Sequence, residues 1–280
     1  MSLSFEMVQI PFRDGYVGAG RFWAGTGQAV LYLHGIQSHG LWFEQSAGAL
    51  NRLGCSVLLA DRRGSGLNEP SRGHVDRYTH WIADAIDGLD WLKARTGRDR
   101  AHVIGVSWGG KLAMALARVT PERLASLTLV APGLFPAVDV SLGDKFAIAL
   151  SLPIHPKKLF PIPLNEPELF TANPVRQTFI RGDKLRLTQV TAKFLFQSRR
   201  LDGFIRRIPE RLNLPVKLFL AGHERIIDNV KTIRYFRALR NTGPKQLAFY
   251  PHASHTLEFE PDNTPFLNDL QEWIRHVTNR

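Results

Sequence analysis

The fold of this chain is decided by the stretch Ile104-Gly105-Val106-Ser107-Trp108-Gly109-Gly110. The apolar residues just before it, 101–104, predict a short buried strand, and residues 111–118, just after it, have the composition of a helix. A serine on a tight turn between strand and helix projects from the carboxyl edge of a sheet. Gly105 and Gly109 fit such a turn, because side chains there would collide where the two backbones approach. The stretch therefore predicts a nucleophile elbow, with its serine as the nucleophile.

Runs typical of buried strands and of amphipathic helices alternate along most of the chain. At the start, extended runs on either side of Asp14-Gly15 predict an antiparallel hairpin. This alternation predicts an α/β fold with a mostly parallel sheet flanked by helices, and the reactive loops of such a fold lie at the carboxyl ends of its strands. The further strands are predicted at residues 29–33, 56–60, 101–104, 124–130, 216–220 and 246–250, and the helices at 41–53, 78–93, 111–118, 230–240 and 264–277.

The alternation stops at about Pro136 and resumes near residue 213. Residues 137–212 are rich in proline and contain only short helical patterns, such as 184–197, with no convincing run of buried strands. They carry 13 Lys and Arg against 7 Asp and Glu, with apolar residues mixed in. We therefore predict a core formed by residues 1–136 and 213–280, interrupted by a helical cap, or lid, at 137–212. A lid that is basic outside and apolar underneath suits an acyl chain with a polar or anionic head.

Cysteine usage and the distribution of apolar residues bear on where the protein works. Cys55 is the single cysteine and has no partner for a disulfide, which favours a reducing compartment. The amino-terminal residues 1–6 lack a basic region followed by an apolar core, and nowhere does an apolar run reach the roughly 18 residues that a membrane span needs. We therefore expect a cytoplasmic protein without a signal peptide or a membrane span.

The chain is strongly basic, with a formal net charge of +11. Its arginines are spread out, often in pairs such as Arg62-Arg63 and Arg199-Arg200, and no basic run is long enough for a nucleic-acid-binding arm. Most of this charge is interpreted as a solvated surface. Weak attraction to an anionic membrane surface is the functional interpretation that we favour, and we expect no nucleic-acid partner.

Ser107 needs chemical help, because a serine hydroxyl at neutral pH is a poor nucleophile. It requires a base to take its proton and an acid to orient and stabilise that base. Glu224 and Asp228 follow one predicted strand, and His255 follows the last. Since parallel strands bring their carboxyl ends to one edge of the sheet, these residues can converge on the serine. The order along the chain is serine, acid, histidine.

With these residues in place, the sequence resembles the serine hydrolases of the α/β-hydrolase superfamily, and in particular the monoglyceride lipase and lysophospholipase branch. The resemblance spans nearly the whole predicted core, whereas residues 137–212 match only loosely. The motifs that carry it are His34-Gly35, Asp61-Arg62-Arg63-Gly64-Ser65-Gly66, Gly105-Val106-Ser107-Trp108-Gly109, Gly222-His223-Glu224-Arg225-Ile226-Ile227-Asp228 and Ser254-His255.

The resemblance implies a catalytic triad of Ser107, Glu224 and His255, with Asp228 as the competing acid, because this branch more often has aspartate where Glu224 stands. The backbone N–H of Trp108 is expected to donate to the oxyanion, and the resemblance implies that Ile36 supplies the second N–H. It further implies a cap after the sixth strand, no metal and no organic cofactor. Asp61 and the glycines after it are interpreted as scaffold near the elbow.

The function that this resemblance implies is hydrolysis of carboxylic esters, through an acyl-enzyme. We expect a small-molecule acyl ester as substrate, lipid-like or monoacyl, of the monoacylglycerol or lysophospholipid type. An acyltransferase, a peptidase or a carbon–carbon bond hydrolase would use the same triad, and fold analogy does not separate these reactions. A catalytically silent binding module on the same scaffold is the alternative from another class.

Overall fold

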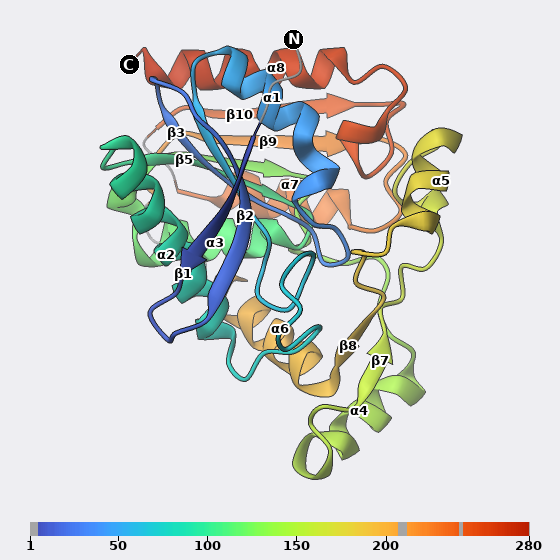
Figure 1. The fold of residues 1–280 in the computed structure, drawn as a ribbon. Coiled ribbons are helices and arrows are strands. Elements are labelled where there is room, and N and C mark those ends of the chain that lie inside the picture. The colour runs from blue at the N-terminus through green and yellow to red at the C-terminus, as the bar shows by residue number, and fades with distance from the viewer. Residues whose placement is uncertain (1–4, 207–211, 241–242, 280) are drawn as a thin grey trace.

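The computed structural model describes residues 5–206, 212–240 and 243–279. Its centre is an eight-stranded sheet with the strand order β1-β2-β4-β3-β5-β6-β9-β10, in which β3, β4, β5, β6, β9 and β10 run parallel (Figure 1). The hairpin of β1 and β2 adds the two antiparallel strands at one edge. The predicted fold class is thereby confirmed. The strands are β1 (Glu6–Pro11), β2 (Val17–Trp23), β3 (Ala29–Leu33), β4 (Ser56–Ala60), β5 (Ala101–Val106), β6 (Leu124–Val130), β9 (Val216–Ala221) and β10 (Lys245–Tyr250).

Helices cover both faces of this sheet, with α1 and α8 on one face and α2 and α3 on the other (Figure 1). Because of this double cover, every residue of β3 and of β5 is buried, which explains why β3 is apolar throughout and β5 is mostly apolar, with His102 as its polar residue. The edge strand β10 is only half-buried. The helices packed on the sheet are α1 (Glu44–Arg52), α2 (Tyr78–Thr96), α3 (Gly109–Val119), α7 (Asn229–Ala238) and α8 (Thr264–Thr278), with short 3-10 turns at Gly40–Phe43, Pro121–Arg123 and Leu257–Phe259.

The chain between β6 and β9 is here called the β6–β9 segment (residues 131–215). Its described residues contribute no strand to the eight-stranded sheet. Figure 1 shows α4, β7 and β8 on the side of the molecule opposite α8. Residues 207–211, at the end of the predicted lid, lie outside the described residues. The elements of the segment are α4 (Leu142–Ile154), β7 (Leu159–Pro161), the 3-10 turn Pro167–Leu169, α5 (Pro174–Gly182), β8 (Gln189–Thr191) and α6 (Ala192–Arg206).

One prediction for this segment was wrong. The helix expected over 184–197 begins only at Ala192, because Gln189–Thr191 forms the strand β8 and pairs antiparallel with β7. Val190 and Thr191 are β-branched and are buried in this small sheet, where a pleated strand accommodates them better than a helix does. Strands of three residues are too short to leave a periodic pattern in the sequence.

The strands end in register, and this alignment positions the loops that follow them. Leu33 at the end of β3 pairs with Ala60 on one side and with Gly105 on the other. Val106 pairs with Val130, and Ala221 at the end of β9 pairs with Tyr250. The loops that begin at residues 34, 61, 107, 131, 222 and 251 therefore leave the sheet along a single edge.

Candidate active site

Ser107 occupies the sharp turn between β5 and α3. Its φ angle is +52°, in the left-handed region that residues other than glycine rarely adopt. Backbone hydrogen bonds hold this strained residue from three directions. Its N–H donates to Val130 O at 2.9 Å, and its carbonyl accepts from Gly133 N at 2.6 Å and from Gly110 N at 2.9 Å. The turn thus holds the serine at the sheet edge in a fixed conformation.

The glycines of the elbow are there because the backbones around them nearly touch. A Cβ atom on Gly105 would lie 2.7 Å from the carbonyl oxygen of Gly109 and 2.7 Å from the Cβ atom of Ala113. A Cβ atom on Gly109 would collide with the carbonyl oxygens of Leu33 and His34. These positions accept no side chain without a shift of the backbone.

Glu224 and His255 lie against each other. His255 Nδ1 is 2.8 Å from Glu224 Oε2 and 2.9 Å from Oε1. The two side chains are 2% and 1% exposed. Burial would raise the pKa of Glu224, but the neighbouring His255 and the backbone N–H groups of Ile226 and Ile227 lower that pKa below its usual value. The carboxylate is therefore ionised at neutral pH and accepts the Nδ1 proton of the imidazole.

Asp228, the competing acid, is engaged elsewhere. It is the N-cap of α7, where its side chain accepts from Lys231 N at 2.9 Å and pairs with Lys231 Nζ at 2.9 Å. No contact between Asp228 and His255 is present among the described residues. Of the two carboxylates, only Glu224 is brought to the histidine.

Ser107 and His255 are not hydrogen-bonded to each other within the described part of the chain. His255 Nε2 is buried and has no hydrogen-bond partner there. The ring packs near Phe170, with 6.1 Å between the ring centroids. Bonds between such groups are often long in structures without a bound ligand and shorten when substrate is present. An unpartnered imidazole nitrogen is free to accept a proton.

The loop after β3 is held at the peptide between Gly35 and Ile36. The carbonyl of Gly35 accepts two bonds, from His34 Nδ1 at 2.8 Å and from Arg62 Nη1 at 2.9 Å. In a trans peptide the next N–H, that of Ile36, points away from this carbonyl. A Cβ atom on Gly35 would lie 3.3 Å from the Cβ atom of Ser107, so the loop passes directly against the elbow.

His34 serves this loop as a donor and does not act as a base. Its Nε2 accepts the backbone N–H of Arg62 at 2.8 Å, which leaves the proton on Nδ1 for the carbonyl of Gly35. Burial and the nearby Arg62 lower the pKa of His34 well below its usual value. The ring is therefore neutral and fixed in one tautomer.

Arg62 supports both sides of the elbow. Besides Gly35, its guanidinium donates to Ile36 O at 2.9 Å, and it stacks 4.6 Å from the ring of Trp108. Burial lowers the pKa of Arg62 to about 9. The motif that contains this arginine was noted in the sequence, but its contacts reach across to the loop after β3 and leave no local signal.

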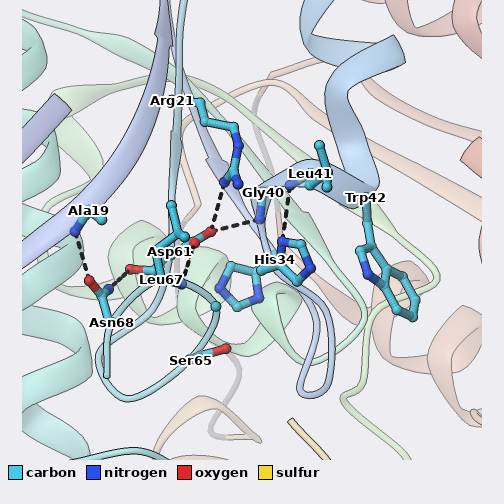
Figure 2. A network of polar contacts seen from close by, with 12 residues as sticks. Ala19, Arg21, His34, Gly40, Leu41, Trp42, Asp61, Ser65, Leu67 and Asn68 are labelled. Atoms are coloured by element: carbon cyan, nitrogen blue, oxygen red, sulfur yellow. Dashed lines mark hydrogen bonds and ion pairs between the residues drawn. The ribbon is translucent and has the colours of Figure 1, made fainter. Parts of the chain in front are cut away.

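Asp61, just before this arginine, connects several segments behind the loop (Figure 2). Its buried carboxylate accepts from Gly40 N at 2.7 Å and from Leu67 N at 3.0 Å, and lies 3.5 Å from Arg21 Nη1. Asn68 continues this network, since its amide donates to Asp61 O at 2.7 Å. These contacts fix the turn after β4 against the loop after β3, which is a scaffold role.

The β6–β9 segment also fastens onto the loop after β3. Leu187 N donates to Gln37 O at 2.9 Å, and Arg186 Nε donates to Gln37 Oε1 at 3.0 Å. Asp183 accepts from Trp42 Nε1 at 2.7 Å and lies 3.0 Å from His39 Nε2. Residues 183–187 thus hold Gln37, the residue that follows Ile36. Sequence patterns gave no indication of these contacts, because they join residues that are far apart along the chain.

A cavity of about 500 Å³ lies over the elbow. Ser107, Trp108 and Ile36 form part of its wall. The opposite wall belongs to the β6–β9 segment and is mostly apolar. Its apolar residues include Ile148, Ala149, Leu152, Ile162, Leu164 and Leu195. The serine therefore faces a chamber large enough for an apolar chain.

Among residues 5–206, 212–240 and 243–279, no group of three or more His, Cys, Asp or Glu side chains is close enough together to hold a metal ion. In that same part of the chain, no helix is both long and apolar enough to cross a bilayer.

Comparison with known proteins agrees with this geometry. The human monoglyceride lipase is 24% identical over 267 residues, which cover 92% of this chain and 86% of the lipase. The monoacylglycerol lipase of Paleococcus ferrophilus superposes with a TM-score of 0.81 at 18% identity, covering 98% and 99% of the two chains. A soluble variant of the Saccharomyces cerevisiae monoglyceride lipase, in complex with a substrate analog, gives 0.84 at 17% identity, covering 99% and 96%.

A protein family is also matched over most of the chain. Residues 25–262 match the family described as serine aminopeptidase, S33, and this range contains the elbow, both carboxylates and His255. The resemblance identified in the sequence is confirmed. The chain therefore belongs to the serine aminopeptidase S33 family, and it shares its fold with the two lipases superposed above.

Proposed function

We propose that the protein hydrolyses lipid-like monoacyl esters through a covalent acyl-enzyme formed on Ser107. The observation that carries this proposal is the buried pair of Glu224 and His255, which leaves His255 Nε2 unpartnered among the described residues at the sheet edge where Ser107 projects. The cavity over the serine supplies room for an acyl chain.

In the first half of the reaction, Ser107 Oγ attacks the carbonyl carbon of the ester while His255 Nε2 takes the hydroxyl proton. Glu224 holds the ring through Nδ1 and stabilises the imidazolium that forms. The backbone N–H groups of Trp108 and Ile36 donate to the developing oxyanion. When the tetrahedral intermediate collapses, the alcohol leaves with the proton from Nε2, and Ser107 keeps the acyl group.

In the second half, water repeats the attack. His255 Nε2 takes a proton from water as its oxygen bonds to the acyl carbon, and then returns that proton to Ser107 Oγ as the carboxylic acid leaves. Losing one oxyanion donor typically costs about 3 kcal/mol of transition-state stabilisation. The bonds from His34 and Arg62 to the peptide before Ile36 therefore support the rate as well as the fold.

Residues 137–212 act in this proposal as a cap, and the core is formed by residues 1–136 and 213–280. Support comes from the apolar cavity wall, which α4 and neighbouring parts of the β6–β9 segment provide above Ser107. Monoacylglycerols and lysophospholipids are the substrates that we favour, because a single acyl chain fits this chamber and because the relatives include monoglyceride lipases.

The decisive test is covalent labelling with a fluorophosphonate probe, followed by turnover. Wild-type protein is expected to label and to hydrolyse members of a panel of p-nitrophenyl esters, monoglycerides and lysophospholipids. Ser107→Ala is expected to do neither. If the wild type neither labels nor cleaves any short acyl ester, the chain is a silent binding module and the proposal is wrong.

We also propose that α4 brings the protein to anionic membrane surfaces. One face of this helix lines the cavity, while the other exposes Leu142, Phe146 and Ile154 at 83%, 68% and 71%. Lys157 and Lys158 come shortly after the end of this helix in the chain. Apolar side chains beside cations suit an anionic bilayer surface. Sedimentation with phosphatidylglycerol vesicles is expected to exceed that with phosphatidylcholine vesicles and to decrease in Phe146→Ser. Equal sedimentation with both lipids would contradict this role.

A further inference from the structure

One end of the cavity is charged, unlike the apolar wall opposite. Lys111 stands on the first turn of α3, directly after the elbow, and Ser198 and Asp202 stand one helical turn apart on α6. All three line the same cavity as Ser107. The sequence carried a signal for this feature, since Lys111 is a lone cation at the start of an apolar helix.

The charged end is tightly built. Lys111 Nζ lies 2.6 Å from Asp202 Oδ1, and these side chains are only 8% and 6% exposed. Nζ also donates to Ser198 Oγ at 3.4 Å, and Ser198 Oγ accepts the indole N–H of Trp108 at 2.9 Å. Ser198 therefore connects the ion pair of Lys111 and Asp202 to Trp108, the residue whose backbone N–H we expect to donate to the oxyanion.

Positive charge is in excess at this end. Arg199 also lines the cavity, its side chain is 72% exposed, and within the described residues its nearest carboxylate oxygen, on Asp202, is 4.0 Å away. Burial lowers the pKa of Lys111, and the nearby guanidinium groups of Arg206 and Arg199 lower it further, against the opposing effect of Asp202. The charged residues that line the cavity are thus three cations, Lys111, Lys145 and Arg199, and two carboxylates, Asp139 and Asp202.

The remaining charged residues of the wall do not remove this excess. Asp139 pairs with Lys145 at 2.6 Å, and Arg199 is close enough to help lower the pKa of Asp139, but the lining still carries one more cation than carboxylates. A purely structural link between α3 and α6 would not require an ion pair, because buried ion pairs contribute little net stability compared with apolar contacts. Such a link would also leave the placement of Arg199 unexplained.

We propose that Lys111 and Arg199 form a subsite for an anionic group of the substrate, a carboxylate or a phosphate, while the apolar wall holds its alkyl chain. The substrate class is then an acyl ester that carries a negative charge. As a statement about substrate, this inference rests on the proposed hydrolase function. As a statement about binding, it does not depend on turnover.

Binding is therefore the first measurement. Titration calorimetry of the full chain with decanol, decanoate and decyl phosphate compares one alkyl chain with a neutral, a carboxylate and a phosphate end. We expect one or both anions to bind at least about ten-fold more tightly than decanol, since charge-assisted hydrogen bonds in a partly buried site are strong. The anion with the larger gain in affinity over decanol shows whether the subsite prefers a carboxylate or a phosphate.

Variants locate the effect in this subsite. Arg199→Gln, at an exposed position, is expected to keep the fold and to reduce the preference for anions by about ten-fold. Arg200→Gln is the matched control, because it removes the same charge from the next residue of α6, which does not line the cavity. The double variant Lys111→Met/Asp202→Leu removes the buried pair without leaving either charge alone, and we expect it to weaken anion binding with decanol unaffected.

The outcomes separate the two proposals. The subsite would be overturned if the wild type bound all three ligands equally tightly. It would also be overturned if both Arg199→Gln and the double variant kept the wild-type preference for anions. If anion binding behaves as expected but no ester is cleaved, the subsite stands and the hydrolase function fails. If esters are cleaved, kcat/KM for 1-decanoylglycerol 3-phosphate or for monomethyl decanedioate is expected to exceed that for its neutral counterpart, 1-decanoylglycerol or methyl decanoate.

Discussion

His255 Nδ1 lies 2.8 Å from Glu224 Oε2, whereas Asp228, four residues further along the same loop, caps α7. This difference yields a prediction for the two amide variants. Glu224→Gln is expected to lower kcat by about two to four orders of magnitude, because an amide supports the imidazolium poorly. Asp228→Asn is expected to retain kcat within about three-fold and to cost at most about 1 kcal/mol of stability as a helix cap. Steady-state kinetics on a p-nitrophenyl ester measure both. Unchanged turnover in Glu224→Gln would exclude it as the acid.

The two adjacent arginines after β4 are expected to separate rate from stability. Arg62→Lys keeps a cation but loses the fork that holds Gly35 and Ile36, so we expect kcat to fall by about ten- to a hundred-fold with KM little changed. Arg63 pairs instead with Asp84 and Asp14, away from the elbow. Arg63→Lys is expected to lower the melting temperature with kcat retained. Equal loss of kcat in the two variants would show that Arg62 has no special effect on the oxyanion loop.

Glu258 is expected to make the stability of the fold depend on pH. It is buried beneath α1, where it accepts from Ser46 N at 2.8 Å and from Ser46 Oγ, and burial raises its pKa to about 7. In the unfolded chain its pKa returns to about 4.3. Between these two values the folded state binds more protons than the unfolded state, so stability falls as pH rises from about 4 to about 7.

Glu258→Gln removes this titration, and the comparison with the wild type isolates it from the other ionisable groups. The loss in the wild type is on the order of 3 kcal/mol, so its melting temperature, measured relative to the variant, is expected to drop by several degrees between pH 5 and pH 8. A difference in melting temperature that stays constant over this range would contradict a raised pKa.

Glycine-to-alanine substitutions are expected to have opposite effects at two positions. Gly109→Ala places a methyl group against the carbonyl oxygens of Leu33 and His34, and we expect loss of activity together with destabilisation by several kcal/mol. Gly203 lies in α6, and a Cβ atom there would have no heavy atom within 4 Å. Gly203→Ala is expected to stabilise by roughly 0.5–1 kcal/mol. Thermal unfolding measures both, and a stable, active Gly109→Ala would disprove the close approach at the elbow.

The sequence was informative where a local pattern reflects a local cause. Gly105 and Gly109 bracket Ser107 because of the close packing at one turn, and the buried strands are mostly apolar because helices cover both their faces. The strand β8 was missed because Gln189–Thr191 is too short for any periodicity. The elbow and the long buried strands were predictable because their causes leave a pattern over several neighbouring residues, whereas β8 is too short to leave one.

The candidate site was predictable only up to the choice between its partners. Glu224 and Asp228 follow the same strand, and only the family resemblance favours Glu224, because no local pattern indicates which side chain turns back toward His255. The contacts of Arg62 with the loop after β3, and of Asp183 with His39, join distant segments. Such contacts form only when the whole chain is folded, so no sequence pattern near either residue predicts them.

The attachment of residues 183–187 to the loop after β3 has a consequence for redesign. Leu187 and Arg186 hold Gln37, the residue after Ile36, whereas the apolar wall of the cavity is built mainly from residues 138–164. A chimaera that exchanges the whole β6–β9 segment would break these anchors together with the wall. Exchange of residues 138–154 alone, which ends with α4 and leaves β7 and Leu164 in place, offers a route to new acyl specificity in which the bonds of Leu187 and Arg186 to Gln37 are kept.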